Sequence, residues 1–520
     1  MKDEKNLPHF ITSGSVPYFT LYTSHFTLYT SHFTLHTSHF TLHTSHFILQ
    51  MNQVDLAFTP ALEQAQLIRQ REVSPLELVE LYLERIQQLD SQLGSYFTVA
   101  AEMALADAQA KTEQLAQTSD ASELPPFFGV PIAIKDLNSV EGIRCTYGTP
   151  VLMDKIAAYT DGVVMRIKHA GFTILGKTAT SELASLPYIE QPGFPPTRNP
   201  WNLDYTAGGS SGGAAAAVAA GLTSIAQGSD AGGSIRGPAF CCGLVGIKPA
   251  RGRVSYAPVG DYLNGIASNG PIARTVADAA ALLDVMSGYV TGDPYWLPKP
   301  ETSFLDATRQ APTQLRIAFS TSVQPVGEAG GICQQSIRET VQLLEGMGHI
   351  VEPGCPDFTG LIEPFKTVWS ASVTASGIPK EVLSPMNRWI AEQSGSAGEY
   401  LQAVHQMQVI ARRIVAFFDS FDVLVLPTYL HPQIRVGEWA NLSPEETLEK
   451  ITGWIAPCPP CNASGLPAIA LPTGFDSSTG LPVGIQLVGR PAAEATLIAL
   501  AAQLEKAKPW SQHRPPSFSS

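Results

Sequence analysis

The sequence predicts an α/β fold in which helices cover both faces of one sheet. Short apolar runs typical of buried strands recur along the chain, and stretches with helical periodicity separate them. Alternation of this kind is typical of a sheet packed between helices. Apolar residues make up 44% of the 520 and charged residues 15%, which is enough apolar material for one large core. No strong linker splits residues 53–510, so we expect a single domain there.

The first half of the chain opens with clear helix signals. Ser74-Pro75-Leu76-Glu77 is a capping box with proline at the first helical position, and it predicts a helix that runs to about Leu89. A second helix is expected over residues 100–117. After a pair of prolines, the apolar run over residues 128–135 predicts a buried strand that ends on a lysine.

The alternation continues to the end of the chain. Asp161 can cap one of the later helices, and Gly221 can stop another. The remaining helices are expected at residues 161–170, 214–220, 275–286 and 492–506. The remaining strands are expected at residues 172–175, 222–226, 315–319, 423–426, 468–471 and 483–487.

The N-terminal part of the chain is a repeat. Residues 19–47 repeat a seven-residue unit, Phe-Thr-Leu-Tyr/His-Thr-Ser-His. A coiled coil would need two apolar positions in each unit with helix formers between them, whereas these residues are poor helix formers. The histidines that recur every seven residues are too far apart for one local metal site, and a repeated stretch of coding DNA explains the pattern better. We therefore expect residues 1–50 to be disordered or to lie upstream of the true start at Met51, and residues 51–520 to form the functional domain.

The composition excludes several function classes. A net charge of −13 argues against a large basic surface for nucleic acid or anionic membranes. No apolar run reaches the roughly 18–20 residues of a membrane-spanning helix, and the N-terminus lacks the apolar core of a signal peptide, so we expect a cytoplasmic protein. The seven cysteines include a Cys458-x-x-Cys461 pair without further ligands at zinc spacing. Buried free thiols are the better interpretation, and we expect no metal there.

Two loops rich in serine and glycine are candidates for chemistry. They span residues 209–213, at the start of a helix, and residues 230–237, after a strand. Consecutive glycines let backbone N–H groups converge, as an oxyanion hole requires, and a serine at the end of such a run places its hydroxyl beside those donors. Each loop taken alone is more often an ordinary tight turn.

Two other motif matches lie in an unsuitable context. Residues 171–178 fit the P-loop pattern, but a helix precedes the first glycine and an apolar strand fills the space that a phosphate-binding loop needs. Residues 208–212 fit the nucleophile elbow Gly-x-Ser-x-Gly, but residues 199–206 before them are expected to be a loop rather than a strand. None of the histidines that could complete that triad has a distinctive surrounding: His349, His405, His431 and His513.

Lys135 is unusual because it ends an otherwise apolar strand. A buried lysine is costly unless it is neutral or paired. One interpretation is an ion pair with Asp136 or another acid. The other is a general base whose pKa is lowered from about 10.4 toward neutrality by desolvation.

Several long motifs, in order, resemble the amidase signature family. They lie at residues 130–136, 208–213, 228–238 and 243–249, with further matching stretches at 199–202 and 462–468, and the resemblance covers roughly residues 54–510. It implies the fold of that family, one large mixed sheet flanked by helices on both faces. It also implies a Ser–cis-Ser–Lys triad, in which two serines stand at a fixed interval. Ser210 and Ser234 are 24 positions apart, which matches that interval.

The resemblance assigns a role to each residue of the two loops. Ser234 is expected to be the nucleophile that forms an acyl-enzyme, Ser210 the bridging serine in a cis peptide bond, and Lys135 the base of the proton relay. The expected oxyanion hole consists of the backbone N–H groups of Ala231, Gly232, Gly233 and Ser234. Residues at positions that support the loops are Ser211, Asp230 and Arg236.

The branch of the family is a further expectation. The glutamine-hydrolysing member of the glutamyl-tRNA amidotransferase complex carries a Lys-Arg-Arg motif in a Glu-rich pattern, which residues 411–415 lack, and the C-terminal part resembles hydrolases of aminohexanoate oligomers. We therefore expect a stand-alone amidase. The two less favoured alternatives are that member of the complex and an inactive relative that acts by binding. Its expected partner is a small amide, with no cofactor, nucleic acid or membrane, and a homodimer is allowed. Aromatic pocket candidates, by composition alone, are Tyr147, Phe194, Trp369 and Trp454.

Overall fold

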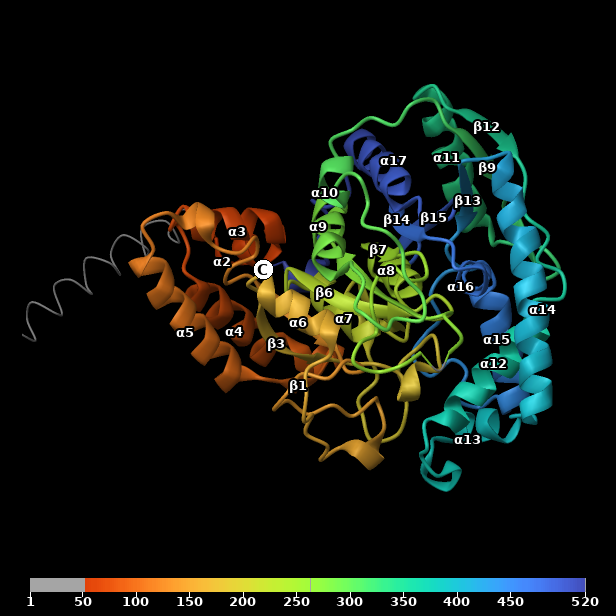
Figure 1. The fold of residues 1–520 in the computed structure, drawn as a ribbon, viewed down its shortest axis with the longest axis horizontal. Helices are drawn as coiled ribbons and strands as arrows, with labels where there is room; N and C mark the ends of the chain where they lie inside the picture. The colour runs from red at the N-terminus through yellow and green to blue at the C-terminus, as the bar shows by residue number, and fades with distance from the viewer. Residues whose placement is uncertain (1–51, 262, 520) are drawn as a thin grey trace, which may run out of the picture. The chain divides into compact units, whose positions relative to one another are not determined.

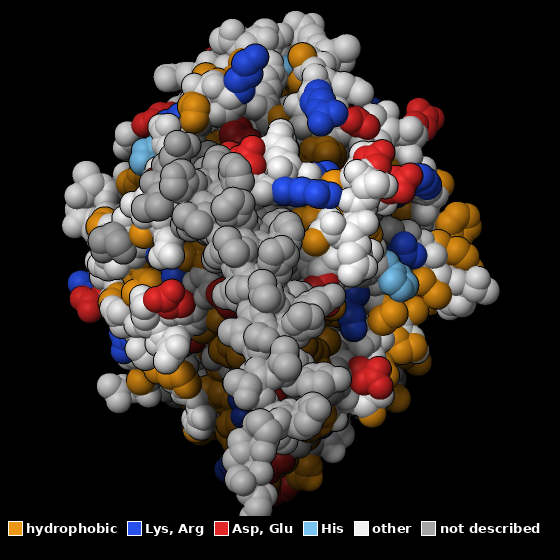
Figure 2. Space-filling model, turned by 90° about the vertical axis from the view of Figure 1, so that its left-hand side faces the viewer, with side chains coloured by type: hydrophobic (Ala, Val, Ile, Leu, Met, Phe, Trp, Pro, Cys, Tyr) orange, Lys and Arg blue, Asp and Glu red, His pale blue; other side chains and the backbone are white. Residues whose placement is uncertain are grey.

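A computed structural model describes residues 52–261 and 263–519 (Figure 1). The expectations for residues 1–50 and for a start at Met51 lie outside the described residues. The described residues from Gln53 onward cluster as one compact unit. On the face drawn in Figure 2, acidic and basic side chains are interspersed among apolar ones.

A mixed sheet of eleven strands, counted over the described residues, runs through this unit in the order β1-β3-β2-β6-β8-β7-β14-β15-β13-β9-β12. The α/β prediction with one large mixed sheet is confirmed. The pairs β2–β3, β2–β6, β9–β12 and β9–β13 are parallel and the other neighbours are antiparallel. The strands are β1 (Tyr96–Val99), β2 (Pro131–Lys135), β3 (Thr173–Thr178), β6 (Ile225–Asp230), β7 (Val245–Lys248), β8 (Ser268–Ala273), β9 (Arg316–Phe319), β12 (Ile350–Pro353), β13 (Val423–Pro427), β14 (Ala468–Phe475) and β15 (Pro482–Gly489).

Helices flank the sheet. They are α2 (Gln53–Phe58), α3 (Ala61–Arg69), α4 (Pro75–Leu93), α5 (Ala101–Gln117), α6 (Gly162–His169), α7 (Gly212–Ala219), α8 (Arg236–Cys242), α9 (Val276–Met286), α10 (Phe304–Ala307), α11 (Gly331–Gly346), α12 (Ile362–Ala375), α13 (Pro385–Glu392), α14 (Ala397–Ala416), α15 (Pro444–Ile455), α16 (Pro459–Ser464) and α17 (Glu494–Ala507). Helices α7 and α8 pack against each other and against central strands, and α9, α10 and α17 form a second group against the sheet (Figure 1).

The capping-box prediction is confirmed at α4. The Ser74 hydroxyl accepts from the N–H of Glu77, and the Glu77 carboxylate accepts from the N–H of Ser74, so two otherwise unpaired helical donors are satisfied. The helix runs to Leu93, beyond the expected end near Leu89. Gly94 stops it in the left-handed conformation, at a φ of 62°.

Strand β6 differs from its prediction. The apolar pattern predicts a strand at residues 222–226, whereas β6 spans Ile225–Asp230. Its last four residues, Gln-Gly-Ser-Asp, are polar or glycine, yet Gln227 and Asp230 are fully buried because their side chains make internal hydrogen bonds. Apolar periodicity cannot detect a strand of this kind.

Two further segments depart from the expectations. Residues 199–206 are not a loop, because β5 (Asn202–Thr206) pairs with β4 (Arg198–Asn199) in a small hairpin outside the main sheet. A second two-stranded sheet, β10 (Ser322–Val323) with β11 (Gly327–Glu328), was also not predicted. Strand β8, Ser-Asn-Gly-Pro-Ile-Ala, lies in the middle of the main sheet although its sequence lacks a strand pattern.

The parallel pair β2–β6 positions the candidate site. Parallel neighbours end at the same edge of a sheet, so the last residues of the two strands, Lys135 and Asp230, reach a common edge. The loop at residues 231–235 continues from β6 at that edge and leads into α8. The sheet thus brings together residues that are about a hundred positions apart.

Close packing of β7 against β8 predicts a large effect of Gly270→Ala. A Cβ at Gly270 would lie 2.1 Å from the carbonyl oxygen of Ile247, which is backbone in the neighbouring strand and has no room to move. We expect the free energy of unfolding, measured by urea denaturation, to fall by about 3 kcal/mol or more. Gly453→Ala on α15 is the matched control, because its Cβ would meet nothing within 4 Å. It should be neutral or stabilise by up to about 1 kcal/mol. Equal stability of the two variants would contradict the close packing.

Candidate active site

The structure brings Lys135, Ser210 and Ser234 to one place from three elements. Lys135 is the last residue of β2, Ser210 lies in the loop before α7, and Ser234 lies in the turn between β6 and α8. Lys135 Nζ is 2.7 Å from Ser210 Oγ. Lys135 and Ser210 are inaccessible to solvent, whereas Ser234 retains 8% exposure. The peptide bond between Gly209 and Ser210 is cis.

The surroundings of Lys135 suit a neutral amine. Its Nζ also lies 3.0 Å from Ser229 Oγ and 3.4 Å from the carbonyl oxygen of Ser229. Burial lowers the pKa of Lys135 well below its ordinary value, and the negative charge of Asp230 offsets only part of this. A neutral amine has two N–H groups and one lone pair. It can therefore donate to Ser229 and accept from the hydroxyl of Ser210.

Asp136 does not pair with Lys135. Successive side chains of a strand point to opposite faces, and Asp136 instead forms an ion pair with Lys177 of β3, with 3.0 Å between Oδ1 and Nζ. Both side chains of that pair are completely buried. Of the two interpretations of Lys135, the geometry therefore favours the unpaired, neutral lysine. It also gives Lys177, the lysine of the P-loop match, a structural role within a strand.

The loop that carries Ser210 is held on both sides. A Cβ at Gly209 would lie within 2.7 Å of the backbone of residues 186–188, so only glycine fits there. The Ser211 hydroxyl donates to the carbonyl of Ser229 at 3.1 Å and accepts from its N–H at 3.3 Å. The N–H of Ser211 donates to the carbonyl of Ser234 at 3.2 Å. Ser211 thus ties this loop to β6 and to the turn of Ser234.

The turn at residues 231–234 differs in one donor from the expected oxyanion hole. The N–H of Gly233 donates to Asp230 Oδ1 at 2.8 Å and is therefore already occupied. The N–H groups of Ala231, Gly232 and Ser234 donate to none of the described residues. The hydroxyl of Ser234 likewise has no hydrogen-bond partner among the described residues, and it borders a cavity.

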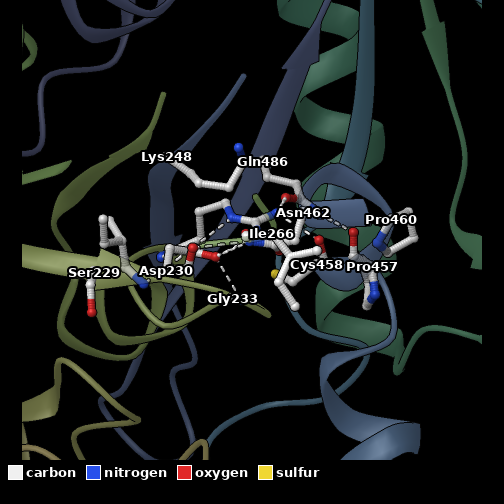
Figure 3. Close-up of polar contacts among 12 residues, drawn as sticks. Ser229, Asp230, Gly233, Lys248, Ile266, Pro457, Cys458, Pro460, Asn462 and Gln486 are labelled. Carbon is white, nitrogen blue, oxygen red and sulfur yellow. Dashed lines mark hydrogen bonds and ion pairs between the residues drawn. The ribbon is translucent and has the colours of Figure 1, made fainter. Parts of the chain in front are cut away.

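Asp230 forms a buried ion pair with Arg236. Figure 3 labels Asp230 and residues that surround the pair, among them Cys458, Asn462 and Gln486. Arg236 Nε and Nη2 lie 3.0 and 2.9 Å from the two carboxylate oxygens. The remaining N–H groups donate to Asn462 Oδ1 at 2.7 Å, to Gln486 Oε1 at 2.9 Å and to the carbonyl of Cys458 at 3.1 Å. Burial alone would raise the pKa of Asp230, but the guanidinium of Arg236 and the hydrogen bonds hold that pKa well below its ordinary value.

Three amide side chains that have no role among the sequence-based expectations belong to the site. Asn462 Nδ2 donates to Asp230 Oδ1 at 2.9 Å and to the carbonyl of Ile266 at 3.0 Å. Gln486 Nε2 donates to the carbonyl of Pro457 at 2.8 Å. Gln227 Oε1 accepts the backbone N–H of Lys135 at 3.1 Å. A single amide side chain inside an apolar strand is the signal that could have found Gln486, whereas Asn462 lies in the helix α16 and lacks that signal.

A cavity of about 410 Å³ opens onto Ser234. Gly209, Gly232 and Gly233 form its floor beside the serine, and most of its walls are apolar. Phe365 and Trp369 of α12 stack with their ring centroids 5.9 Å apart and their planes at 17°. A Cβ at Gly232 would lie 3.7 Å from each of these rings, so the aromatic pair lies directly over the floor.

Of the four aromatic pocket candidates, Trp369 alone lines this cavity. Trp454 is inaccessible and packs against the rings of Tyr429 and His431. Phe194 stacks on a neighbouring phenylalanine, and the ammonium of a lysine lies over Tyr147.

The rival sites do not assemble among the described residues. None of the described histidines bonds to Ser210; His349, for instance, bonds the N–H of Leu315 at 3.2 Å. Cys458 and Cys461 are free and buried. Within residues 52–261 and 263–519, no group of three His, Cys, Asp or Glu side chains is placed to hold a metal ion. None of the helices in these ranges is long and apolar enough to cross a membrane.

The family model described as Amidase matches residues 77–498. The chain is 55% identical over 460 residues to a putative amidase of Synechocystis sp., covering 88% of this chain and 90% of the relative. It is 33% identical over 492 residues to a component of the glutamyl-tRNA(Gln) amidotransferase of Moorella thermoacetica, covering 89% and 99%. Its fold is similar to that of 6-aminohexanoate cyclic dimer hydrolase, with a TM-score of 0.82 and 30% identity over 88% of this chain and 99% of the other.

The Asp230–Arg236 pair predicts a large effect of Arg236→Lys. A lysine has three N–H groups on one atom and cannot reach the four partners of Arg236, so buried acceptors are left unpaired. We expect the free energy of unfolding to fall by about 3–5 kcal/mol in urea denaturation. Arg309→Lys is the control, because Arg309 forms an exposed ion pair with Asp306, and it should change stability by less than about 0.5 kcal/mol. Wild-type stability of Arg236→Lys would show that the pair does not hold the turn.

Proposed function

This chain belongs to the amidase signature family and is a hydrolase of carbon–nitrogen bonds, and we propose that it cleaves its amide through an acyl-enzyme formed on Ser234. The observation that carries this proposal is the 2.7 Å contact between Lys135 Nζ and Ser210 Oγ in a completely buried setting. A lysine that is buried without a carboxylate partner is held neutral, and only a neutral amine accepts a proton.

The first step is attack on the amide carbonyl. Ser234 Oγ bonds to the carbonyl carbon while its proton passes to Ser210, whose own proton passes to Lys135 Nζ. The negative charge that develops on the carbonyl oxygen is stabilised by free backbone N–H groups of the turn, those of Ala231, Gly232 and Ser234. Gly233 is left out of this set because its N–H is held by Asp230.

The second step breaks the carbon–nitrogen bond. Lys135 returns its proton through Ser210 to the leaving nitrogen, the amine departs, and the acyl group remains on Ser234. A water molecule then attacks the ester, with the same relay accepting its proton, and the carboxylic acid is released. Hydrogen bonds of catalytic groups often tighten only when substrate is bound, and we expect the free hydroxyl of Ser234 to bond to Ser210 once an amide fills the cavity.

Asp230, Arg236 and Ser211 act in this proposal by positioning. The Asp230 carboxylate accepts from the N–H of Gly233, Arg236 forms an ion pair with Asp230, and the backbone N–H of Ser211 donates to the carbonyl of Ser234. None of these residues needs to contact the substrate. Together they hold the hydroxyl of Ser234 and the N–H donors of the turn in fixed positions relative to each other.

A stand-alone hydrolase is favoured over the glutamine-dependent amidotransferase component by the charges of the cavity. Free glutamine carries an ammonium and a carboxylate, and a site built for it needs a partner for each. The only charged side chains among the described residues that line the cavity, Glu363 and Lys366, are paired with each other at 3.1 Å. Hydrolysis of simple amides by the purified chain alone, without preference for glutamine, would support this choice.

Replacement of the triad residues tests the chemistry. We expect Ser234→Ala to reduce amide hydrolysis to background, a loss of about 10⁴-fold or more in kcat/KM. Lys135→Ala should lower it by about 10²–10⁴-fold, with Ser210→Ala between or near these variants, because each removes a step of the relay. Mass spectrometry of acid-quenched reactions should find the acyl group on the peptide that contains Ser234. Ser478→Ala, at an exposed turn, is the control. Full activity of Ser234→Ala would refute the assignment.

The low pKa of Lys135 predicts the pH profile. Protonated Lys135 cannot accept a proton, so kcat/KM should rise as pH rises through the pKa of this group. Because burial lowers that pKa well below its ordinary value of 10.5, the rise should be complete well below pH 10.5. Between the folded and unfolded pKa the unfolded chain binds the extra proton, so Lys135 makes stability increase with pH there. A flat profile, or a midpoint at 10.5 or above, would contradict a neutral lysine base.

A further inference from the structure

The cavity over Ser234 is apolar inside and charged at its mouth. Its walls are formed largely by the apolar side chains of α12, α13 and α15 and of the segment from Val323 to Val326. Glu363 and Lys366 are 81% and 38% exposed, so their ion pair faces solvent. A second, larger hollow shares several residues with this cavity. It is also lined by three further charged residues, Glu445, Glu449 and Lys450. The charged residues therefore lie on the outer side, where a substrate would enter.

The aromatic pair on α12 lies next to the turn at which the reacting carbonyl is proposed to bind. The oxyanion donor Gly232 lies directly below Phe365 and Trp369. The indole N–H of Trp369 donates to the carbonyl of Ser185 at 3.2 Å, which fixes the ring with its apolar part toward the cavity. A group attached to a carbonyl held at Ser234 therefore packs against these rings.

One face of α15 forms another part of the wall. Leu448, Ile451 and Ile455 of α15 follow one another at helical spacing and line the cavity. Trp389 of α13 joins this wall, and its indole N–H donates to Glu445 Oε1 at 3.0 Å, which links α13 to α15 near the mouth. Glu363 and Lys366 form their ion pair at the mouth, and the other described residues that line the cavity are uncharged.

These walls select by charge and by apolar area. A charged group moved into the interior loses its hydration and gains no counter-ion there, whereas each buried methylene favours binding. We propose that the substrate is an amide that bears an uncharged aromatic or extended aliphatic group, that this group fills the cavity, and that Trp369 selects it. The inference rests on the proposed function, because it assumes that the reacting carbonyl lies at Ser234.

A series of simple amides tests the substrate class. Hexanamide and 4-phenylbutanamide should each exceed acetamide in kcat/KM by about 100-fold, since a buried methylene contributes a factor of about four. Adipic acid monoamide has the chain length of hexanamide with a carboxylate at its far end, and it should be at least about 100-fold poorer than hexanamide.

Replacement of Trp369 tests the selecting residue. Trp369→Ala should lower kcat/KM for hexanamide and 4-phenylbutanamide by about 10–100-fold and for acetamide by less than about threefold, and Trp369→Phe should restore most of the loss. Trp296→Ala is the matched control, because Trp296 is 62% exposed and lies outside the cavity, and it should change neither. Thermal unfolding of each variant checks that the fold is intact.

The outcomes separate this inference from the chemistry on which it rests. Hydrolysis of acetamide, hexanamide and adipic acid monoamide at similar efficiency, or a preference for glutamine, would overturn the inference while Ser234-dependent hydrolysis stands. A uniform loss on all amides in Trp369→Ala would remove Trp369 as the selecting residue. Absence of hydrolysis of every amide would instead overturn the proposed function and the inference with it.

Discussion

The buried ion pair between Asp230 and Arg236 is the constraint on which the geometry of the site depends. A pair of charges without solvent is stable only when all of its remaining hydrogen-bonding groups are satisfied, and here Asn462, Gln486 and the carbonyl of Cys458 complete the set. These partners belong to α16, β15 and the segment before α16, more than 200 positions along the chain. The turn that carries the candidate nucleophile is therefore held by contacts with the C-terminal part of the chain.

Two neighbouring lysines differ in whether a carboxylate pairs with them. Lys135 and Lys177 end or nearly end adjacent parallel strands, and both are completely buried. Asp136 follows Lys135 in the sequence but faces the other side of the sheet, where it neutralises Lys177. The Asp136 carboxylate therefore contributes to the packing of the sheet, and the amine of Lys135 has the hydroxyls of Ser210 and Ser229 as partners.

The fold class and the two serine loops could be predicted from the sequence because apolar periodicity and glycine runs are local signals. The triad assignment needed the resemblance, since no local pattern relates Lys135 to Ser210 across the sheet. The polar end of β6 and the whole of β8 could not be predicted, because their burial depends on long-range hydrogen bonds such as that of Gln227 to Asn269. The hydrogen bond from the N–H of Gly233 to Asp230 likewise could not be predicted from any pattern in the sequence.

The walls of the cavity and the reacting groups come from separate stretches of the chain. The candidate triad lies within residues 135–234, on strands and loops of the central sheet, whereas the walls come largely from residues 323–393 and 448–460, on helices that lie apart from β6 and α7 in Figure 1. Among the described residues, the Asp230–Arg236 pair makes no hydrogen bond to α12, α13 or α15. Substitutions on these three helices can therefore change which group fits the cavity without removing a hydrogen-bond partner of the ion pair, so the shape of the cavity can change independently of the turn at Ser234.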